Sequence, residues 1–211
     1  MIRRPPRSTL DRSSAASDVY KRQDLSNSND SAKERPGGQS LLGEDDISLK
    51  LRRLATQIAE MHSSGEVYFV GIHTRGVTVA KRVKALLSEM GIDVQLGTLD
   101  ISFYRDDLDH MITNPKVQSS EIPFEIEGNN IIIFDDVLYT GRTIRSAIQG
   151  IFKYGRPSKV ELAVLIDRGN RELPIQPDYV GQVVETKRLD TISVCFEEHD
   201  GEDSISLISA S

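Results

Sequence analysis

Apolar residues recur along the chain with a helical spacing in two segments. In the first they stand three to four residues apart, and they are Ile47, Leu51, Leu54, Ile58 and Met61. This spacing predicts an amphipathic helix over residues 45–62. The second segment, 77–90, has a similar pattern and is followed by Gly91, and glycine commonly ends helices. A third helix is predicted after the turn 135–142 and extends to about residue 154.

Short apolar runs alternate with these helices and predict buried strands. The runs lie at 67–72, near 93–101, at 131–134, at 160–166, near 191–197 and near 204–209. The segment 167–181 contains two prolines and two glycines and is interpreted as a loop. Strands that alternate with helices favour an α/β fold with a mostly parallel central sheet flanked by helices. In such sheets, ligands bind beyond the carboxyl ends of the strands.

Two segments lack apolar periodicity. Residues 1–42 are rich in Ser, Arg, Asp, Asn and Gly, and we expect them to be disordered. Residues 1–23 also resemble translated sequencing-adaptor sequence, so this N-terminal extension is interpreted as disordered or artefactual. The folded domain is then expected over residues 43–211. Residues 103–128 predict a long flexible loop, and loops of that length in compact domains often serve as lids or binding loops.

Composition and charge narrow the class of protein. The chain has 211 residues, of which 38% are hydrophobic, and this suits one globular domain with a sizeable core. No apolar run is long enough to span a membrane. The single cysteine, Cys195, excludes an internal disulfide and favours a reducing, cytoplasmic setting. Residues 43–211 hold 18 Lys and Arg against 27 Asp and Glu, which counts against a broad nucleic-acid surface.

The candidate chemistry centres on residues 131–144, IIIFDDVLYTGRTI. Asp135 and Asp136 directly follow the predicted strand, so we expect them at its carboxyl end, where a ligand and solvent can reach them. Thr140 and Gly141 open the next helix, whose N-terminus offers N–H groups and partial positive charge that suit a phosphate. Two acids beside an anion-binding turn predict a ligand with a phosphate and hydroxyls, such as a sugar phosphate, or a magnesium ion.

Three other interpretations of this stretch compete. IIIFDD alone is typical of a Walker B strand, but the chain has no G-x-x-x-x-G-K-[ST] loop for a P-loop nucleotide hydrolase. A dinucleotide-binding fold would need G-x-G-x-x-G after a strand, and that pattern is absent too. The third interpretation is a plain helix cap, because Asp and Thr are common N-caps. Two acids together with T-G-x-T exceed what capping needs.

Residues 131–143 resemble the phosphoribosyl pyrophosphate (PRPP) motif of type I phosphoribosyltransferases. With three further stretches they resemble the PyrR family over residues 45–210, and those stretches are GIHTRG (71–76), DISFYRDDL (100–108) and LAVLIDRGNRELPIQPDYVG (162–181). The resemblance implies the type I phosphoribosyltransferase fold, with a small hood and a long flexible loop. It also implies a bifunctional protein, a uracil phosphoribosyltransferase that makes UMP and pyrophosphate and also regulates pyrimidine genes by binding messenger RNA.

The resemblance assigns roles to residues on three loops. Asp135 and Asp136 would hold the ribose hydroxyls and support Mg²⁺, which would bind mainly through PRPP and not directly to the protein. Arg105, at the base of the long loop, would reach the pyrophosphate when that loop closes. The expected pyrophosphate loop consists of Thr74, Arg75 and Gly76. The phosphate-binding residues of the PRPP motif would be Val137, Leu138, Tyr139, Thr140, Gly141, Arg142 and Thr143.

The resemblance also implies which residues lie near the base, and for two of the arginines there is an alternative to ligand binding. Arg168 would face the substrate, and the base would lie near Ile192, where backbone amides would read the uracil edges. The alternative for Arg75 and Arg105 is a plain surface ion pair, which is common and weak. His73 stands where the family has a lysine, and we assign it no chemistry and expect it to be solvated.

The RNA-binding role is the doubtful part of the resemblance. The family's RNA-contacting basic positions are occupied here by Gln57, Glu60, Asn170, Gln176 and Gln182, and only Arg171 remains. Fewer cations reduce the phosphate-dominated part of RNA affinity. We therefore favour the enzyme, and the alternative is an attenuator that senses UMP or PRPP and binds RNA with weak or no catalysis.

A purine phosphoribosyltransferase is a further alternative, against which the YRDD and DRGNRELPI stretches count. The expected partners are PRPP, uracil and UMP, with a messenger RNA leader as a doubtful one. No membrane partner is expected. The family resemblance implies a homo-oligomer, either a dimer or a tetramer.

Overall fold

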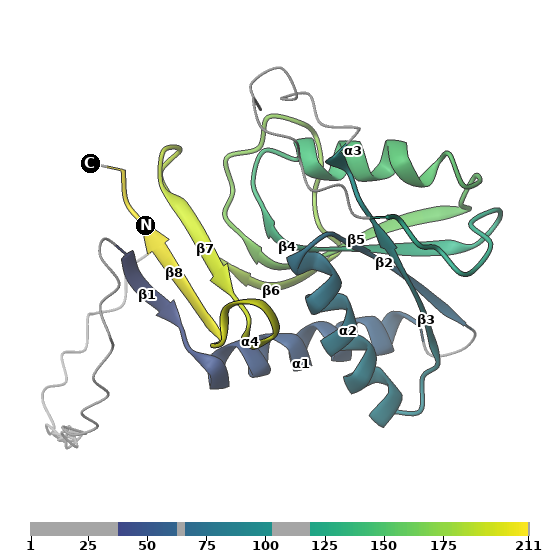
Figure 1. The fold of residues 1–211 in the computed structure, drawn as a ribbon, viewed down its shortest axis with the longest axis horizontal. Coiled ribbons are helices and arrows are strands. Elements are labelled where there is room, and N and C mark those ends of the chain that lie inside the picture. Colours follow the sequence, from purple (N-terminus) through teal and green to yellow (C-terminus); the bar gives the residue numbers. More distant parts are fainter. Residues whose placement is uncertain (1–37, 63–65, 103–118, 211) are drawn as a thin grey trace, which may run out of the picture. The chain divides into compact units, whose positions relative to one another are not determined.

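The fold is described by a computed structural model that covers residues 38–62, 66–102 and 119–210. Within these residues the central element is a five-stranded sheet in which every neighbouring pair is parallel. Its strands, in spatial order, are β3 (Val94–Leu99), β2 (Val67–Ile72), β4 (Asn130–Leu138), β5 (Lys159–Asp167) and β6 (Tyr179–Val183). The α/β class and the mostly parallel sheet expected from the alternating pattern are confirmed (Figure 1).

Helices cover both faces of this sheet, and this explains why its strands read as continuous apolar runs. Helices α1 (Glu44–Met61) and α2 (Arg75–Glu89) pack on one face, and α3 (Arg142–Ile151) lies on the other (Figure 1). Strand β4 divides its side chains accordingly. Ile132 and Phe134 join the core under α1 and α2, while Ile131 and Ile133 join the core under α3.

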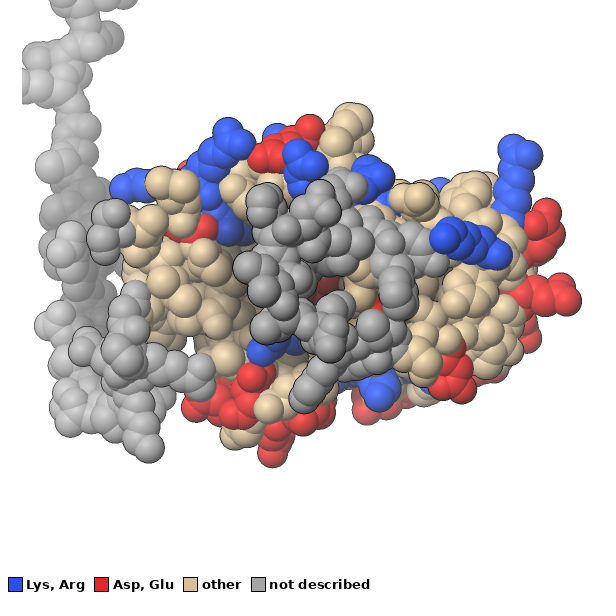
Figure 2. All heavy atoms as spheres, turned by 45° about the horizontal axis from the view of Figure 1, so that its top comes forward, with Lys and Arg blue, Asp and Glu red and all other residues tan. Residues whose placement is uncertain are grey.

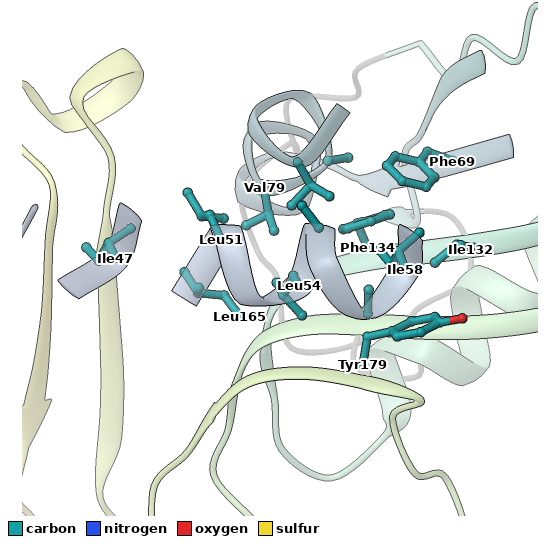
Figure 3. Packing of buried hydrophobic residues seen from close by; sticks show 14 of the residues in the cluster. Ile47, Leu51, Leu54, Ile58, Phe69, Val79, Ile132, Phe134, Leu165 and Tyr179 are labelled. Carbon is teal, nitrogen blue, oxygen red and sulfur yellow. The ribbon is translucent and has the colours of Figure 1, made fainter. Parts of the chain in front are cut away.

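The core under α1 follows from the helical spacing of its apolar residues. Leu51, Leu54 and Ile58 lie on one side of α1, and Figure 3 shows them directed towards the sheet and towards Val79 of α2. The first turn of α1 holds three acidic residues, which is favourable beside the positive end of the helix dipole. Gly91 ends α2 as expected, with φ of +80° and its N–H donating to the Ser88 carbonyl at 3.0 Å.

A second, antiparallel sheet forms the expected small hood. It consists of β1 (Gly38–Leu42), β8 (Ser204–Ile208) and β7 (Thr191–Cys195), in that order, with the short helix α4 (Glu197–Asp200) between β7 and β8. We call these four elements the hood. Strand β1 lies in the part of the sequence that we assigned to the extension, so the folded part begins no later than Gly38. The remainder of the predicted extension lies outside the described residues.

The hood is attached to α2 through charged and polar side chains. Arg82 of α2 forms ion pairs with Glu198 and Asp203, and its guanidinium lies 4.9 Å from the ring centroid of Phe196. The hydrogen bonds from Arg82 hold the pKa of both carboxyl groups below their ordinary values. Thr78 of α2 contacts His199, with 2.8 Å between Oγ1 and Nε2. Together with shared apolar packing, these contacts hold α4 against α2.

Two boundaries differ from the expectation in ways that matter for the site. Strand β4 continues to Leu138, four residues beyond the predicted end, because β5 pairs with it from Asn130 through Leu138. Strand β6 occupies the end of the segment interpreted as a loop, since Tyr179 and its neighbours find a parallel partner in β5. In the described residues, no helix is both long and apolar enough to cross a membrane.

Candidate functional site

The candidate site lies at the carboxyl edge of the parallel sheet, where the segments after β2, β4 and β5 meet. The segment after β2 packs directly on β4, because Gly76 is so close to the Phe134 carbonyl that an added Cβ would collide with it. The segment after β5 is joined to β4 by hydrogen bonds from the Arg168 N–H to the Leu138 carbonyl (3.1 Å) and from Arg171 Nη1 to the Tyr139 carbonyl (2.9 Å). Three of the predicted site segments are therefore neighbours.

Asp135 and Asp136 lie within β4 and not after it, which corrects the expected placement. Asp135 is opposite Val164 in the β5 ladder, and its side chain is buried, with 7% of the residue exposed. Asp136, the next residue of the strand, is half-buried. The expectation that both acids are open to solvent therefore holds only for Asp136, because Asp135 is closed in by the packed edge of the sheet.

Burial changes the acid–base character of Asp135. Loss of hydration raises the pKa of its carboxyl well above the ordinary value, and the negative charge of Asp136 raises it further. A backbone hydrogen bond opposes this effect, since the Asp136 N–H donates to Asp135 Oδ1 at 3.1 Å. A carboxyl in these surroundings would be stabilised by any cation or hydroxyl donor that a ligand brought to it.

The turn between β4 and α3 has the geometry of an anion-binding helix start. Gly141 is buried and adopts φ of +91°, a left-handed conformation that glycine adopts without strain. Helix α3 begins at the next residue, Arg142, whose N–H lies 3.3 Å from Thr140 Oγ1. The Thr140 carbonyl is anchored from the segment after β5, because it accepts the N–H groups of Glu172 (3.0 Å) and Leu173 (3.1 Å).

The other PRPP-motif residues divide into packing and polar groups. Val137 is half-buried against the core under α1, and Leu138 is buried in the core under α3, so the side chain of Leu138 is not available to a ligand. Thr143 is half-buried in the first turn of α3. Arg142 forms an ion pair with Glu172 at 2.9 Å, and Tyr139 donates from its hydroxyl to the Arg188 carbonyl at 2.9 Å.

The predicted pyrophosphate loop brings its main chain close to β4. Thr74 is exposed, and the peptide bond between His73 and Thr74 is cis. Arg75 Nη2 lies 3.1 and 3.2 Å from the two carboxylate oxygens of Asp200 in the hood. In this structure Arg75 therefore forms the ion pair that we considered as its alternative role, and its partner comes from a segment 125 residues further along the chain.

His73, which we expected to be solvated, is half-buried. Its Nε2 is buried and has no hydrogen-bond partner among the described residues. Burial lowers the pKa of His73, although the negative charge of Asp100 acts in the opposite direction. His73 lies where β2, β3 and the pyrophosphate loop pack together, and its backbone N–H donates to the Leu99 carbonyl at 3.0 Å. This packing accounts for the burial of Nε2.

Two arginines that we assigned to ligands point to protein groups. Arg168, expected to face the substrate, is 5% exposed and donates to the Lys187 carbonyl at 3.1 Å and to the Asp190 carbonyl. Arg171, expected as the remaining RNA-binding residue, is paired with Asp167 at 2.6 Å and donates to the carbonyls of Tyr139, Gly169 and Ile175. The sequence placed both residues near the site but did not reveal these partners.

The remaining assignments concern the base and the long loop. Ile192 lies on β7 and is 8% exposed, packed in the core under α1. Arg105 lies outside the described residues. The described end of this loop at residues 120–121 is linked back to β3 and to Asp100, because Thr98 pairs with Glu121 and the Asp100 backbone N–H donates to Ser120 Oγ at 2.9 Å.

The described acids fit a magnesium ion only in part. Within the described residues, no group of three His, Cys, Asp or Glu side chains is arranged to hold a metal. Asp135 and Asp136 supply two adjacent carboxylates, and Mg²⁺ commonly combines one or two carboxylates with water and substrate phosphate oxygens. The donor set therefore suits a metal that arrives with a phosphorylated ligand and does not form a closed protein cage.

Comparisons with known proteins agree with this geometry. Residues 39–199 match the family described as the phosphoribosyl transferase domain. The bifunctional protein PyrR of Elusimicrobium minutum is 46% identical over 166 residues, covering 78% of this chain and 93% of the relative. The bifunctional protein PyrR of Deinococcus radiodurans is 42% identical over 170 residues, covering 80% and 93%.

Solved structures share the fold at lower sequence identity. A hypoxanthine-guanine phosphoribosyltransferase from Bacillus anthracis superimposes with a TM-score of 0.64 at 17% identity, covering 83% of this chain and all of the other. The hypoxanthine phosphoribosyltransferase of Trypanosoma cruzi gives 0.62 at 16% identity, covering 82% and 97%. At these identities the likeness shows the fold alone. The match to the domain family and the identity to the PyrR proteins show more: the chain belongs to the phosphoribosyl transferase domain family and, within it, to the family of bifunctional PyrR proteins.

Proposed function

We propose that this phosphoribosyltransferase transfers the 5-phosphoribosyl group of PRPP to uracil, giving UMP and pyrophosphate. In this reaction the bond between ribose C1 and a pyrophosphate oxygen breaks, and the electron pair leaves with pyrophosphate. A bond forms between C1 and uracil N1, which loses its proton. The observation that carries the proposal is the arrangement of Asp135 and Asp136 in β4, followed at once by the Gly141 turn and the N-terminus of α3.

Each half of that arrangement suits one half of a ribose 5-phosphate. The N-terminus of α3 presents N–H groups to an anion, and the left-handed Gly141 opens this helix directly. The carboxylates of Asp135 and Asp136 would accept hydrogen bonds from ribose hydroxyls. Positive charge develops on the ribose as the C1 bond breaks, and nearby carboxylates stabilise that charge.

The other roles belong to the same proposal. The main chain at Thr74 and Gly76 would contact the pyrophosphate, and Arg105 would approach it from the long loop. A bound Mg²⁺ would neutralise charge on the pyrophosphate oxygens. The proposal also includes uracil and UMP as ligands near Ile192, a cytoplasmic location and a homo-oligomeric state, either dimer or tetramer.

The direct test is UMP formation from uracil and PRPP in the presence of Mg²⁺, measured by chromatography of the products. Asp136→Asn should lower kcat/KM by about 100-fold or more, as expected when an electrostatic contact to the transition state is removed. Asp93→Asn is the matched control, because Asp93 is exposed just before β3. A wild-type protein that forms no UMP but uses a purine base would overturn the assignment of the base.

The second candidate function is RNA-dependent regulation, which the name of the relatives' family raises by its word "bifunctional". The contacts of Arg171 weigh against it, since its guanidinium already donates to four protein acceptors and its side chain is only 14% exposed. On the face shown in Figure 2, lysine and arginine side chains of the described residues lie interspersed with acidic ones. RNA affinity depends on phosphate contacts by free cations.

The measurement that separates the two functions is binding of the messenger RNA leader of the organism's own pyrimidine genes, with and without UMP. We expect weak binding that does not depend on UMP, together with active UMP synthesis. Tight UMP-dependent binding in a protein without turnover would reverse the order of the two candidates.

A further inference from the structure

The segment that precedes β7 is a closed turn whose shape is determined by one buried acid. Residues 187–190 form this turn, and the Asp190 N–H donates to the Lys187 carbonyl at 3.2 Å. The Asp190 side chain, 7% exposed, accepts the Lys187 N–H through Oδ2 at 2.8 Å. Leu189 stands at the tip and is 78% exposed. The turn leads directly into β7, which carries Ile192.

Arg168 holds this turn from the end of β5. Its Nη2 donates to the carbonyls of Lys187 and Asp190, and its Nε donates to Thr186 Oγ1 at 3.1 Å. The planar guanidinium can reach several acceptors at once because its donors have a rigid, forked arrangement. Three neighbouring positions of the chain are thereby tied to one buried side chain.

Tyr139 connects the same turn to the phosphate site. Its hydroxyl donates to the Arg188 carbonyl at 2.9 Å, and the Arg168 guanidinium stacks on its ring at 4.1 Å from the centroid. Tyr139 lies directly between Leu138, the end of β4, and the Gly141 turn. The turn 187–190 and the start of the phosphate-binding turn therefore share one rigid pair of side chains.

We propose that Arg168 and Tyr139 are positioning residues that fix the turn 187–190 as a wall of the base site, at a set distance from the 5′-phosphate turn. This inference rests on the proposed transfer to a base. With the carbonyls of Lys187, Arg188 and Asp190 engaged, neither Arg188 nor Leu189 donates its backbone N–H to another described residue. Fixed N–H donors suit a pyrimidine, whose ring carbonyls are acceptors.

The test compares the Michaelis constants of the two substrates. Tyr139→Phe removes only the hydrogen bond to the Arg188 carbonyl and keeps the ring under Arg168. It should raise KM for uracil by about 2- to 10-fold, the effect of one hydrogen bond, and change KM for PRPP by less than about 2-fold. Arg168→Lys keeps the positive charge but loses the several fixed N–H donors of the guanidinium. The KM of this variant for uracil should therefore rise more than the KM of Tyr139→Phe. Tyr154→Phe, at an exposed tyrosine after α3, is the matched control.

Each outcome decides the inference. An equal rise in both Michaelis constants would show that the pair acts on the phosphate turn, and unchanged constants would show that the turn needs no such support; either result overturns the proposal. If the wild-type protein forms no UMP, the proposed function fails separately. The wall is then tested by calorimetry, where Tyr139→Phe should weaken UMP binding but not ribose 5-phosphate binding, and an equal loss for both ligands would overturn it.

Discussion

Two buried carboxyl groups on neighbouring strands, Asp135 of β4 and Glu161 of β5, have opposite electrostatic surroundings. Glu161 is 2% exposed and lies near the start of its strand. Its Oε1 accepts hydrogen bonds from Lys159 Nζ at 2.7 Å and from the Tyr179 hydroxyl at 3.1 Å. His62 Nε2 lies 2.9 Å from Oε2 and forms an ion pair with it when the imidazole is protonated. Burial acts to raise the pKa of Glu161, but the Lys159 hydrogen bond and the His62 charge lower it below the ordinary value.

Asp135 lies near the end of its strand, and in its case the effects that raise the pKa outweigh those that lower it. Burial and the neighbouring Asp136 both raise its pKa, and only a backbone N–H acts against them. The described surroundings of Glu161 therefore supply its counter-charges, whereas those of Asp135 supply another negative charge. The amino edge of a parallel sheet generally serves stability and the carboxyl edge serves ligands. We therefore infer that a buried carboxyl is structural at the amino edge of this sheet, and the proposed function gives the one at the carboxyl edge a role in the site.

Asp135→Asn should give the largest effect and is the sharpest test of this difference. We expect kcat/KM for UMP synthesis to fall by about 100-fold or more, because a charge that stabilises the ribose is removed. A carboxyl whose pKa is raised in the folded state lowers the free energy of unfolding of the protein as the pH rises from the ordinary pKa to the raised one. An amide cannot ionise, so the variant does not suffer this loss of stability. The free energy of unfolding at pH 7 should therefore rise by about 0.5–2 kcal/mol, as measured by urea denaturation. A variant that loses both activity and stability would mean that Asp135 is structural, as Glu161 is.

Glu161→Gln should have the opposite pattern and a smaller effect. Removing the charge leaves the Tyr179 and His62 groups with a poorer acceptor, so the free energy of unfolding should fall by about 1–3 kcal/mol. We expect kcat/KM to change less than 2-fold at temperatures where the variant is folded, since the cluster lies at the other edge of the sheet. Thermal denaturation and the UMP assay measure the two quantities. A large loss of activity without loss of stability would contradict the division between the edges.

The smallest expected effect concerns His73, another polar group at the carboxyl edge with a buried atom. Burial lowers its pKa from the ordinary 6.5, so below about that pH the unfolded chain binds a proton that the folded chain does not. The stability that neutral His73 contributes is complete above pH 6.5 and declines as the pH falls. The slope from one such group is at most about 1.4 kcal/mol per pH unit. His73→Gln should therefore show a smaller loss of stability between pH 7.5 and 5.5 than the wild type, and identical losses would show that His73 does not take part.

The sequence was informative where the local pattern and the environment agree. The helical spacing in 45–62 and the apolar runs at 67–72 and 160–166 predicted the bounds of a helix and two strands to within a few residues. A helix buried on one face, or a strand buried on both, needs apolar residues at the buried positions, and this pattern is visible in the sequence. The end of β4 was missed because Asp135 and Asp136 are atypical of strands, and pairing with β5 overrides that preference. The same pairing produced β6 in a segment rich in loop residues.

In the site, too, local patterns predicted some features, and contacts between distant segments decided others. The alternation of strands and helices predicted that the segments after the parallel strands would meet at one edge. The packing of Gly76 on Phe134 and the hydrogen bond from Arg171 to the Tyr139 carbonyl show that three of them do. The partners of the arginines could not be predicted, since Arg75 and Asp200 are 125 residues apart and no local pattern links them.

The sequence by itself determined the class of fold and the family, and it predicted where the proposed ligand site lies. It could do so because apolar periodicity and motifs are local properties of the chain. Only the tertiary structure decided that Asp135 is buried while Asp136 is half-buried, and that Arg168 and Arg171 serve carbonyl groups of the protein. Burial and hydrogen bonding depend on which distant segments pack together, and a charged side chain takes its role from those neighbours and not from its own position in the chain.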